Sequence, residues 1–409
     1  MENLLTEIEE IAGDETVFLV GGAVRDIILG RETRDLDLAV EGDAEAFAER
    51  ILTTLGGKTV QMGKDFPFRR VVLGGFTVDV SSVAPGEIVE DLKRRDLTVN
   101  AMAIPLSRYL DKGEVSREDV IDPLGGWEDL REGVIRAVSG ENLVEDPVRF
   151  FRVFRFASEL SFSIHPETLS LIPLCVECPR PHRERVRDEI KGILRGAGFE
   201  EAVARRELSI LFSWYFRVSL DASLFAEVIF RYLAWTKDDL LSPFLGGAGP
   251  GSFMKKELVL LLALLSSGGG RESSWMLAEG LSLGKGGRSF LEKLERGRRE
   301  VSPGFDDEAL AEGLLLLGED FPFFLLYTLV LNDVKEGENM VKKAIKYYSL
   351  RKDIVSGKNL PWDAARVVDE VKQRGGDVRA FMKELKRAAL RGEVASTEEA
   401  ITFVRRIVS

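Results

Sequence analysis

The sequence predicts an α+β protein, with a mixed sheet and its helices at the N-terminal end and an all-helical remainder. Residues 1–135 alternate short β-type runs with helical patterns, whereas from about residue 140 the β signal stops and apolar residues recur with helical spacing. The length of 409 residues also exceeds that of a typical single domain. We therefore expect a small head that contains the sheet, followed by a longer helical part.

Five strands are expected in the head, each from a short run of apolar and β-branched residues. They cover residues 17–20, 36–40, 69–73, 77–81 and 101–105. A helix is expected over residues 43–54, where Asp43 can cap the first turn. Beyond the head, helices are expected over residues 146–160, 166–173, 181–195, 205–235, 253–267 and 308–332.

The composition excludes several classes of protein. The chain is 45% hydrophobic and 30% charged, no apolar run approaches the length of a membrane span, and the acidic N-terminus lacks a signal-peptide pattern. We therefore expect a cytoplasmic protein with no membrane partner. The two histidines argue against His-based metal hydrolysis, and Cys175 and Cys178 lack the second CxxC of a structural zinc site. These thiols are interpreted as packing residues.

The net charge of −12 is unevenly distributed along the chain. Residues 339–409 carry 16 Lys or Arg against 9 Asp or Glu, so the C-terminal end is basic. Such a segment can contact a nucleic-acid backbone, but a solvated helical face gives the same composition. Both interpretations stay open at this point.

A Gly-Gly pair followed by two spaced carboxylates predicts nucleotidyl transfer. Gly21 and Gly22 follow a β-type run and precede a helical segment, so bare backbone N–H groups can approach a phosphate. Asp35 and Asp37 are two positions apart, and alternate residues of a strand point to the same face. Carboxylates so placed can hold the two divalent cations of a phosphoryl-transfer site. Asp79, on a later strand, is the candidate third carboxylate, as general base, second metal ligand or plain surface acid.

Two arginine-rich segments supply further candidates. Arg94 and Arg95 offer donors for phosphate oxygens, and Asp96 and Asn100 can bind ribose hydroxyls. In the second segment Asp146 is expected to cap a helix with Pro147 at its first position. Three arginines then follow at steps of three residues and form one stripe that can bind the edge of a base, while phenylalanines face a core. They are Arg149, Arg152 and Arg155, and the core side has Phe150, Phe151, Phe154 and Ala157.

These segments together resemble the ordered motifs of class II tRNA nucleotidyltransferases and bacterial poly(A) polymerases. The segments are GGAVRDIILGRETRDLDLAV, RRDLTVNAMAI, DPLGGWEDL, EDPVRFFRVFRFA and ERVRDE, within residues 16–195. The resemblance implies a polymerase-β-like nucleotidyltransferase head and a helical neck, body and tail. We place these parts at residues 1–138, 139–200, 201–335 and 336–409.

The resemblance also implies a role for each site residue. Gly21, Gly22 and Arg25 would hold the triphosphate, and Asp35 and Asp37 would bind two Mg²⁺ ions. Asp122 would serve the junction of head and neck. Asp146 and Arg149 would pair with the incoming base of CTP or ATP, in place of a nucleic-acid template. Arg94 or Arg95, with Asp96 and Asn100, would hold phosphate and ribose. The remaining implied residues fix Asp146 and Arg149 or support their helix, namely Glu145, Arg152 and Arg155, and Glu184, Arg185 and Glu189.

The family contains enzymes of different specificity, and one segment bears on the choice. Enzymes that add all of CCA carry a long flexible loop after the third-carboxylate strand, whereas only residues 81–90 separate Val80 from Asp91 here. A pocket that changes shape needs a mobile element with two arrangements. The short segment therefore favours a CC-adding enzyme on tRNA, with a separate A-adding partner enzyme.

Other functions stay open as alternatives. They are a full CCA-adding enzyme, a poly(A) polymerase, an inactive RNA-binding protein and an antibiotic nucleotidyltransferase. Against the polymerase, residues 63–66 match its pattern only in part, and no extended Arg/Lys-rich tail is present. The tail motifs are represented only by remnants at residues 356–360 and 391–394.

Overall fold

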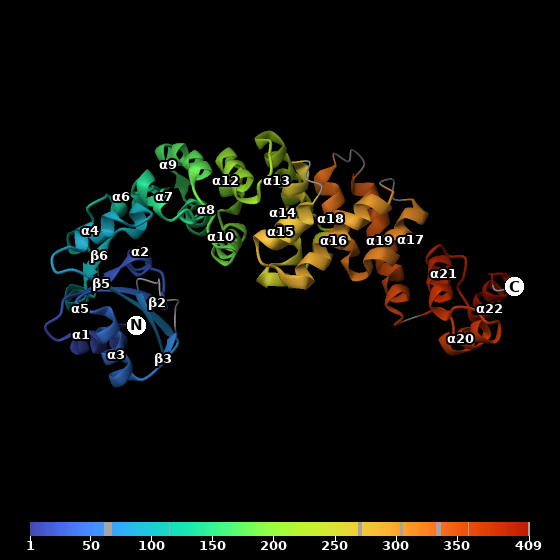
Figure 1. Ribbon diagram of the computed structural model, residues 1–409, viewed down its shortest axis with the longest axis horizontal. Helices are drawn as coiled ribbons and strands as arrows, with labels where there is room; N and C mark the ends of the chain where they lie inside the picture. Colours follow the sequence, from blue (N-terminus) through green and yellow to red (C-terminus); the bar gives the residue numbers. More distant parts are fainter. Residues whose placement is uncertain are drawn as a thin grey trace. The chain divides into compact units, whose positions relative to one another are not determined.

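The computed structural model describes residues 1–60, 68–113, 115–268, 272–302, 306–332, 337–358 and 360–407. The chain forms two compact units, Met1–Val203 and Ala204–Ser409, which Figure 1 colours from blue to green and from green to red. All the motifs between Gly21 and Glu189 belong to the first unit. Residues 63–66 and Asn359 lie outside the described residues.

A six-stranded mixed sheet forms the centre of the first unit, with strand order β3-β4-β5-β2-β1-β6. The parallel pair is β2 and β5, whereas the other neighbouring strands are antiparallel. The five expected strands are confirmed with small shifts of their ends, and the short edge strand β3 is an addition. The strands are β1 (Val17–Val20), β2 (Asp35–Glu41), β3 (Lys58–Val60), β4 (Phe68–Leu73), β5 (Phe76–Val83) and β6 (Ala103–Pro105).

Alternation along β2 separates an apolar face of the sheet from a polar face. Leu36 and Leu38 are buried, whereas Asp35 and Asp37 point to the opposite side. The helices α3 (Ala44–Leu55), α1 (Glu2–Ala12) and α5 (Leu106–Lys112) cover the apolar face. The expected Asp43 cap of α3 is confirmed, because its carboxylate accepts from Glu45 N at 2.8 Å and Ala46 N at 3.3 Å.

Shorter helices lie beside the polar face and lead into the helical end of the first unit. Asp122 accepts hydrogen bonds from Gly126 N and Trp127 N at 2.8 and 3.1 Å, so it fixes the start of α6. A two-stranded parallel sheet pairs β7 (Val134–Ile135) with β8 (Ser163–Ile164). The helices of this region are α2 (Gly21–Ile28), α4 (Ile88–Lys93), α6 (Gly126–Glu132), α7 (Gly140–Glu145), α8 (Arg149–Leu160), α9 (Pro166–Leu171), α10 (Arg183–Arg195) and α11 (Phe199–Val203).

The helix α8 packs against α10 and α11. The expected core residues Phe150, Phe151 and Phe154 are fully buried, and Ala157 is nearly so. The opposite side of α8 carries the three arginines toward the polar face of the sheet. The sequence pattern of this helix is therefore confirmed, although its start is not, as described below.

The two cysteines lie beyond α9, in and just after the 3₁₀ turn Ile172–Glu177, and both are buried as free thiols. Burial raises the pKa of Cys175 to about 12, and burial also raises the pKa of Cys178. This placement agrees with two packing thiols.

Both thiols are expected to react slowly with iodoacetamide at pH 8.5. A free thiol has a pKa of about 8.5, so a thiol with a pKa near 12 has roughly a thousandfold less thiolate at that pH. The measurement compares labelling of the folded chain with labelling in denaturant. Equal rates in the two conditions would contradict the burial of these residues.

The regular secondary structure in the described residues of the second unit is helical. Phe321, Phe323 and Phe324 are buried, so this aromatic run is part of the core of the unit. The last three helices close around an apolar cluster that includes Trp362, Phe381 and others. The helices are α12 (Arg206–Phe216), α13 (Ala222–Thr236), α14 (Lys255–Ser267), α15 (Ser273–Gly280), α16 (Gly284–Glu300), α17 (Asp307–Leu317), α18 (Phe321–Leu331), α19 (Gly337–Ser356), α20 (Ala364–Gln373), α21 (Val378–Leu390) and α22 (Thr397–Ile407).

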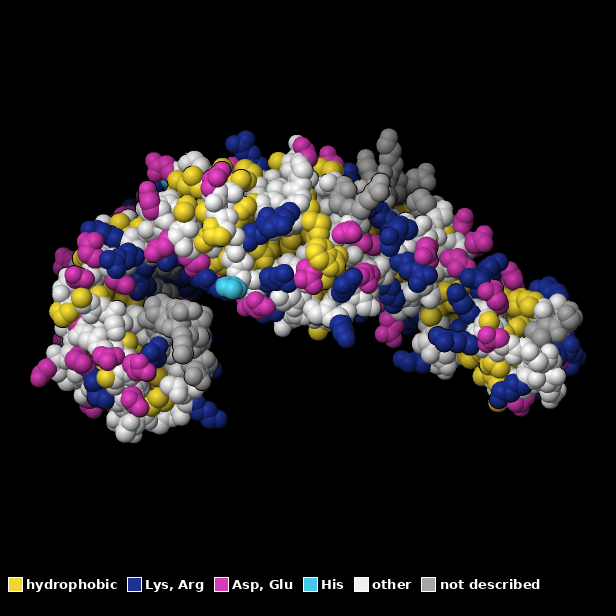
Figure 2. Space-filling view, in the orientation of Figure 1, with side chains coloured by type: hydrophobic (Ala, Val, Ile, Leu, Met, Phe, Trp, Pro, Cys, Tyr) yellow, Lys and Arg dark blue, Asp and Glu magenta, His cyan; other side chains and the backbone are white. Residues whose placement is uncertain are grey.

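Basic residues of the last helices are interleaved with acidic ones. Arg374 and Arg405 both pair with Glu370 at 3.0 Å, and Arg387 pairs with Glu384 at 2.5 Å. Figure 2 shows this mixture of Lys, Arg, Asp and Glu on the visible face of the unit. Part of the excess positive charge of residues 339–409 is therefore neutralised by ion pairs within the fold. A contact of this segment with RNA stays a prediction.

One stretch contradicts the expectation that no run is long and apolar enough to span a membrane. Asp307–Leu331 passes that test by length and composition. It comprises α17 and α18, with a break at Gly318, and 67% of its most apolar window is buried inside the unit. Its apolar character is accounted for by core packing.

Candidate active site

A cavity of about 790 Å³ lies within the first unit, between the polar face of the sheet and the arginine side of α8. Most of the predicted site residues line it, although they are spread over more than 160 positions in the sequence. The lining includes Gly21, Gly22, Arg25, Asp35, Asp37, Asp79, Arg94, Arg95, Asp96, Asn100, Asp146, Arg149, Arg152, Arg155 and Arg185.

The Gly-Gly pair forms the first residues of α2, directly after β1. Gly21 has φ +64°, and a Cβ there would lie 2.8 Å from Arg95 Nη1 and 3.0 Å from Asp37 Oδ2. Gly22 N donates to Asp37 Oδ2 at 3.0 Å. Glycine is therefore required at position 21 by both backbone conformation and space.

The three carboxylates lie on neighbouring strands of one face. In the parallel pairing of β2 and β5, Asp37 is directly opposite Asp79. Burial raises the pKa of Asp37, and the charge of Asp79 adds to the rise, whereas Arg95, the Gly22 N–H and Arg25 act in the opposite direction. Asp37 is thus a half-buried acid surrounded by donors that favour its charged form.

Arg70 on β4 binds the carboxylate of Asp79 from the side that is away from Asp37. Its Nε and Nη2 donate to the two carboxylate oxygens of Asp79 at 2.7 and 2.6 Å, as the pairing of β4 with β5 places the residues opposite each other. No sequence pattern pointed to Arg70. A bidentate arginine also competes with any metal ion for this carboxylate.

The donor chemistry of Asp35 and Asp37 fits a magnesium ion. Mg²⁺ takes oxygen ligands and is commonly bound through one or two carboxylates, with substrate phosphates and water completing its shell. Among the described residues, no group of three or more Asp, Glu, His or Cys side chains forms a metal cluster. Asp35 and Asp37 thus suit an ion that arrives with a phosphate-bearing ligand, while Asp79 is engaged by Arg70.

The residues after α4 connect the glycine turn to α8. Asn100 Oδ1 accepts from Arg25 Nη1 at 2.7 Å, and Arg95 is paired with Asp91 at 3.0 Å. Asp96 is buried and accepts from Arg152 Nε at 2.5 Å. Burial by itself would raise the pKa of Asp96, but the Arg152 guanidinium outweighs it and holds this pKa below its usual range.

The start of α8 differs from the expected helix cap. The sequence predicts Asp146 as cap, but α8 begins at Arg149, and Asp146 follows the end of α7 in an extended conformation. The residue before a proline is disfavoured in the helical region, and α7 already ends at Glu145. The Asp146 carboxylate instead accepts from Arg185 Nη1 and Nη2 at 3.0 and 2.6 Å. Both oxygens of Asp146 are thus bound by Arg185, and both residues line the cavity.

The arginines of α8 are held by acids and carbonyls and are not a solvent-facing stripe. Arg149 Nη1 donates to Asn142 O at 2.9 Å and Arg94 O at 3.1 Å, and lies 3.6 Å from Glu145. Their further contacts are Arg152 with Asp96 and Glu189, and Arg155 with Glu159 and Glu189. Burial raises the pKa of Glu189 despite these two arginines. Glu184 is exposed on α10 and lies outside the lining of the cavity.

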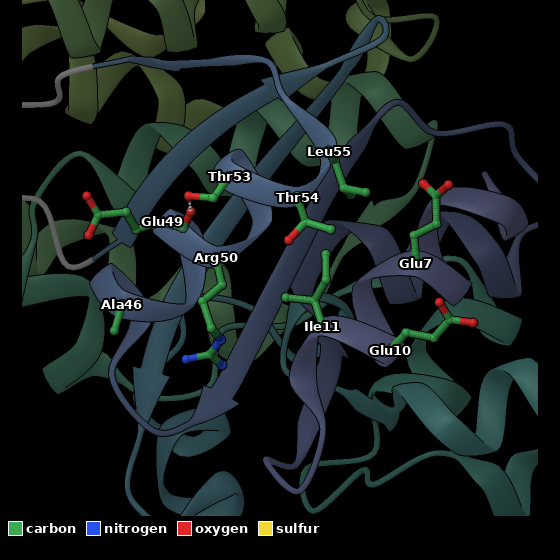
Figure 3. A pocket seen from close by; sticks show the side chains of 9 residues that line it. All are labelled: Glu7, Glu10, Ile11, Ala46, Glu49, Arg50, Thr53, Thr54 and Leu55. Carbon is green, nitrogen blue, oxygen red and sulfur yellow. Dashed lines mark hydrogen bonds between the residues drawn. The ribbon is translucent and has the colours of Figure 1, made fainter.

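A second cavity, of about 930 Å³, lies between α1 and α3. Figure 3 shows Glu7, Glu10 and Ile11 of α1 across from Arg50 and other side chains of α3. It contains none of the predicted site residues. The smaller cavity is the candidate site, because it gathers a glycine turn, carboxylates and arginines from distant segments.

Comparison with known proteins finds similar proteins for the part of the chain that carries these features. Residues 17–136 match the model of the poly A polymerase head domain. The CC-adding tRNA nucleotidyltransferase of Geobacter sulfurreducens is 36% identical over 176 residues, or 42% of this chain and 39% of that protein. The A-adding tRNA nucleotidyltransferase of Deinococcus radiodurans is 37% identical over 183 residues, or 43% and 39%.

The chain is therefore similar to these tRNA nucleotidyltransferases, and the head-domain match lies within its first unit. The matches span only about two fifths of the length of these curated relatives. The fold extends farther, since the Thermotoga maritima CCA-adding enzyme complexed with tRNA has a TM-score of 0.73 at 23% identity. That alignment covers 100% of this chain and 95% of the other.

The resemblance implies that Asp146 pairs with an incoming base, and Arg185 holds the carboxylate of Asp146, so we expect Arg185 to matter for base selection. We predict that Arg185→Ala lowers the preference between CTP and ATP by roughly tenfold, the effect of losing a charge-assisted pair of hydrogen bonds. The measurement is the ratio of kcat/KM for the two nucleotides. The control is Arg187→Ala on the same helix, where Arg187 pairs with Asp188; an equal loss in both variants would contradict the assignment.

Proposed function

We propose that this protein is a tRNA nucleotidyltransferase that adds nucleotides of the 3′-terminal CCA without a nucleic-acid template. The observation that carries the proposal is the meeting of three kinds of group in one cavity. Asp35 and Asp37 suit a metal ion, Arg25 and Arg95 suit phosphates, and Asp146 with Arg149 suits the edge of a base. A nucleoside triphosphate with its metal needs all three. A cytoplasmic location follows from the tRNA substrate.

The proposed reaction transfers one nucleotide at a time. The 3′-hydroxyl oxygen of the tRNA attacks the α-phosphorus, the bond from this phosphorus to the bridging oxygen breaks, and pyrophosphate leaves. Bound Mg²⁺ ions, two in the proposed mechanism, would stabilise the charge that develops on the phosphate oxygens. The N–H groups at the start of α2 and the guanidinium of Arg25 hold the triphosphate in line.

The proton of the attacking hydroxyl needs an acceptor near the polar face. Asp79 is the proposed acceptor, and Asp37 lies beside it in the strand pairing. Arg70 holds the carboxylate of Asp79 in place and balances its charge. If the Arg70 guanidinium moved partly away, one carboxylate oxygen of Asp79 would be free to accept the proton of the hydroxyl.

We infer that addition stops after two cytidylates. Of the ten residues after Val80, the first three extend β5 and the last three begin α4, so only residues 84–87 connect the two elements. This connection is fixed by Gly86 N donating to Glu41 Oε1 at 2.8 Å and by a turn bond from Glu87 N to Ala84 O at 2.9 Å. A four-residue turn that is fixed by hydrogen bonds supports a pocket with a single shape. Such a pocket would accept CTP alone.

Three tRNA substrates test this specificity. They end at the base before CCA, after the first C, and after CC, and each is offered ATP alone or CTP alone. We expect CTP to extend the first two and ATP to extend none. A-adding relatives match the chain as well as CC-adding ones do. The main competing hypothesis is therefore an A-adding enzyme. Extension of only the CC-ended tRNA by ATP would establish it, and a long ladder with ATP would indicate a poly(A) polymerase.

A further inference from the structure

Three guanidinium groups surround the ring of Phe156. The centre of the Arg155 guanidinium lies 4.1 Å from the ring centroid, and those of Arg25 and Arg152 each lie 5.1 Å from it. The ring is 5% exposed and lines the candidate active site. The sequence pattern did not single out Phe156 among the phenylalanines of α8.

These arginines come from two different parts of the first unit. Arg25 belongs to α2 beside the glycine turn, whereas Arg152 and Arg155 belong to α8. Each is also anchored by an acid, with Asp26 on Arg25 at 3.0 Å and Asp96 on Arg152. An aromatic face attracts cations through its negative quadrupole, so one ring can hold several guanidiniums that otherwise repel each other.

Phe156 differs from its neighbours on the helix in what it contacts. Phe150, Phe151 and Phe154 are fully buried and lie outside the lining of the cavity. The ring of Phe156 instead forms part of the cavity wall, between the arginine of the phosphate end and those of the base end. Its position therefore links the two ends of the proposed nucleotide site.

We propose that Phe156 is a positioning residue that couples Arg25 to the base-recognition helix through shared cation–π contacts. The inference rests on the proposed function, since it assumes that the cavity takes a nucleoside triphosphate. A leucine of similar size would fill the space but would leave the three guanidiniums without a common aromatic face. Arg25 would then be displaced from the triphosphate position, while the fold would stay intact.

The test compares Phe156→Leu with Phe154→Leu, a matched change of a core phenylalanine on the same helix. Both variants are measured for thermal stability, for KM and kcat with CTP, and for binding of a non-hydrolysable α,β-methylene analogue of CTP in the absence of tRNA. We expect Phe156→Leu to raise KM and the Kd of the analogue by roughly tenfold, as expected for the loss of two or three cation–π contacts. Phe154→Leu is expected to lower Tm and to leave both constants near those of the wild type.

A third variant, Phe156→Tyr, keeps the aromatic ring and is expected to restore most of the affinity. If Phe156 had only a structural role, the result would be different. The two leucine variants would then differ in Tm but not in nucleotide affinity. Unchanged Kd in Phe156→Leu, or an equal loss in Phe154→Leu, would overturn this inference while leaving the proposed function intact. A wild-type chain that binds neither CTP nor ATP would overturn both.

Discussion

Replacing Asp35 with alanine is expected to abolish nucleotide incorporation, with kcat falling by about a thousandfold or more. The reason is the loss of one of the two carboxylates proposed to hold the metal ion, whose stabilisation of phosphate charge amounts to several kcal/mol. Asp35 is at the start of β2 with an exposed side chain, so its removal disturbs little packing. The measurement is single-turnover incorporation of labelled CTP into tRNA.

Two controls separate loss of chemistry from loss of fold or of RNA binding. Glu45→Ala removes an exposed acid of the same unit, which is paired with Arg69 at 2.8 Å outside the cavity. We expect it to keep full activity. Gel-shift binding of tRNA is expected to be nearly unchanged in Asp35→Ala. Normal turnover in this variant would refute the metal site, and a loss of tRNA binding would refute the role given to Asp35.

Replacing Gly21 with alanine is expected to lower kcat/KM by roughly a hundredfold, close to 2.7 kcal/mol. The new Cβ would meet Arg95 Nη1 at 2.8 Å and Asp37 Oδ2 at 3.0 Å, so both groups must shift away from the site. The positive φ adds about 1–2 kcal/mol of backbone strain for an L-residue. We therefore expect a lowered Tm together with the kinetic loss.

Gly30→Ala separates the strain from the steric effect. Gly30 has the same φ of +64°, but a Cβ there has nothing within 4 Å. It is expected to lose a similar amount of stability and to keep its activity. If Gly30→Ala is as impaired in kcat/KM as Gly21→Ala, the loss comes from the backbone and the close approach in the site is irrelevant.

Local periodicity was sufficient to predict the part of the site that lies on one strand or one helix. The spacing of Asp35 and Asp37 gave their common face, and the pattern around Phe150 and Phe154 gave the buried side of α8. The strands β7 and β8 were missed because two residues are too short for an alternation signal, and the three-residue edge strand β3 was missed as well. Elements of this length depend on their partners and not on their own sequence.

The missed contacts of the site all depend on how separate elements pack against each other. Arg70 reaches Asp79 through the register of β4 and β5, and Arg185 reaches Asp146 from another helix. Phe156 meets Arg25 across 131 positions. Sequence alone shows that such residues are present, but the fold decides which of them meet. The misplaced start of α8 has a related cause, since Asp146 follows the end of a preceding helix that was not expected.

The most direct test is the composition of the 3′ end that the protein builds on a tRNA lacking CCA when CTP and ATP are both present. We predict that intact-mass analysis shows two added cytidylates and no adenylate, even at long times, and that Asp35→Ala leaves the tRNA unextended. Addition of a terminal adenylate would contradict the CC-adding specificity. A tRNA that stays unextended with the wild-type protein would contradict the proposed transfer itself.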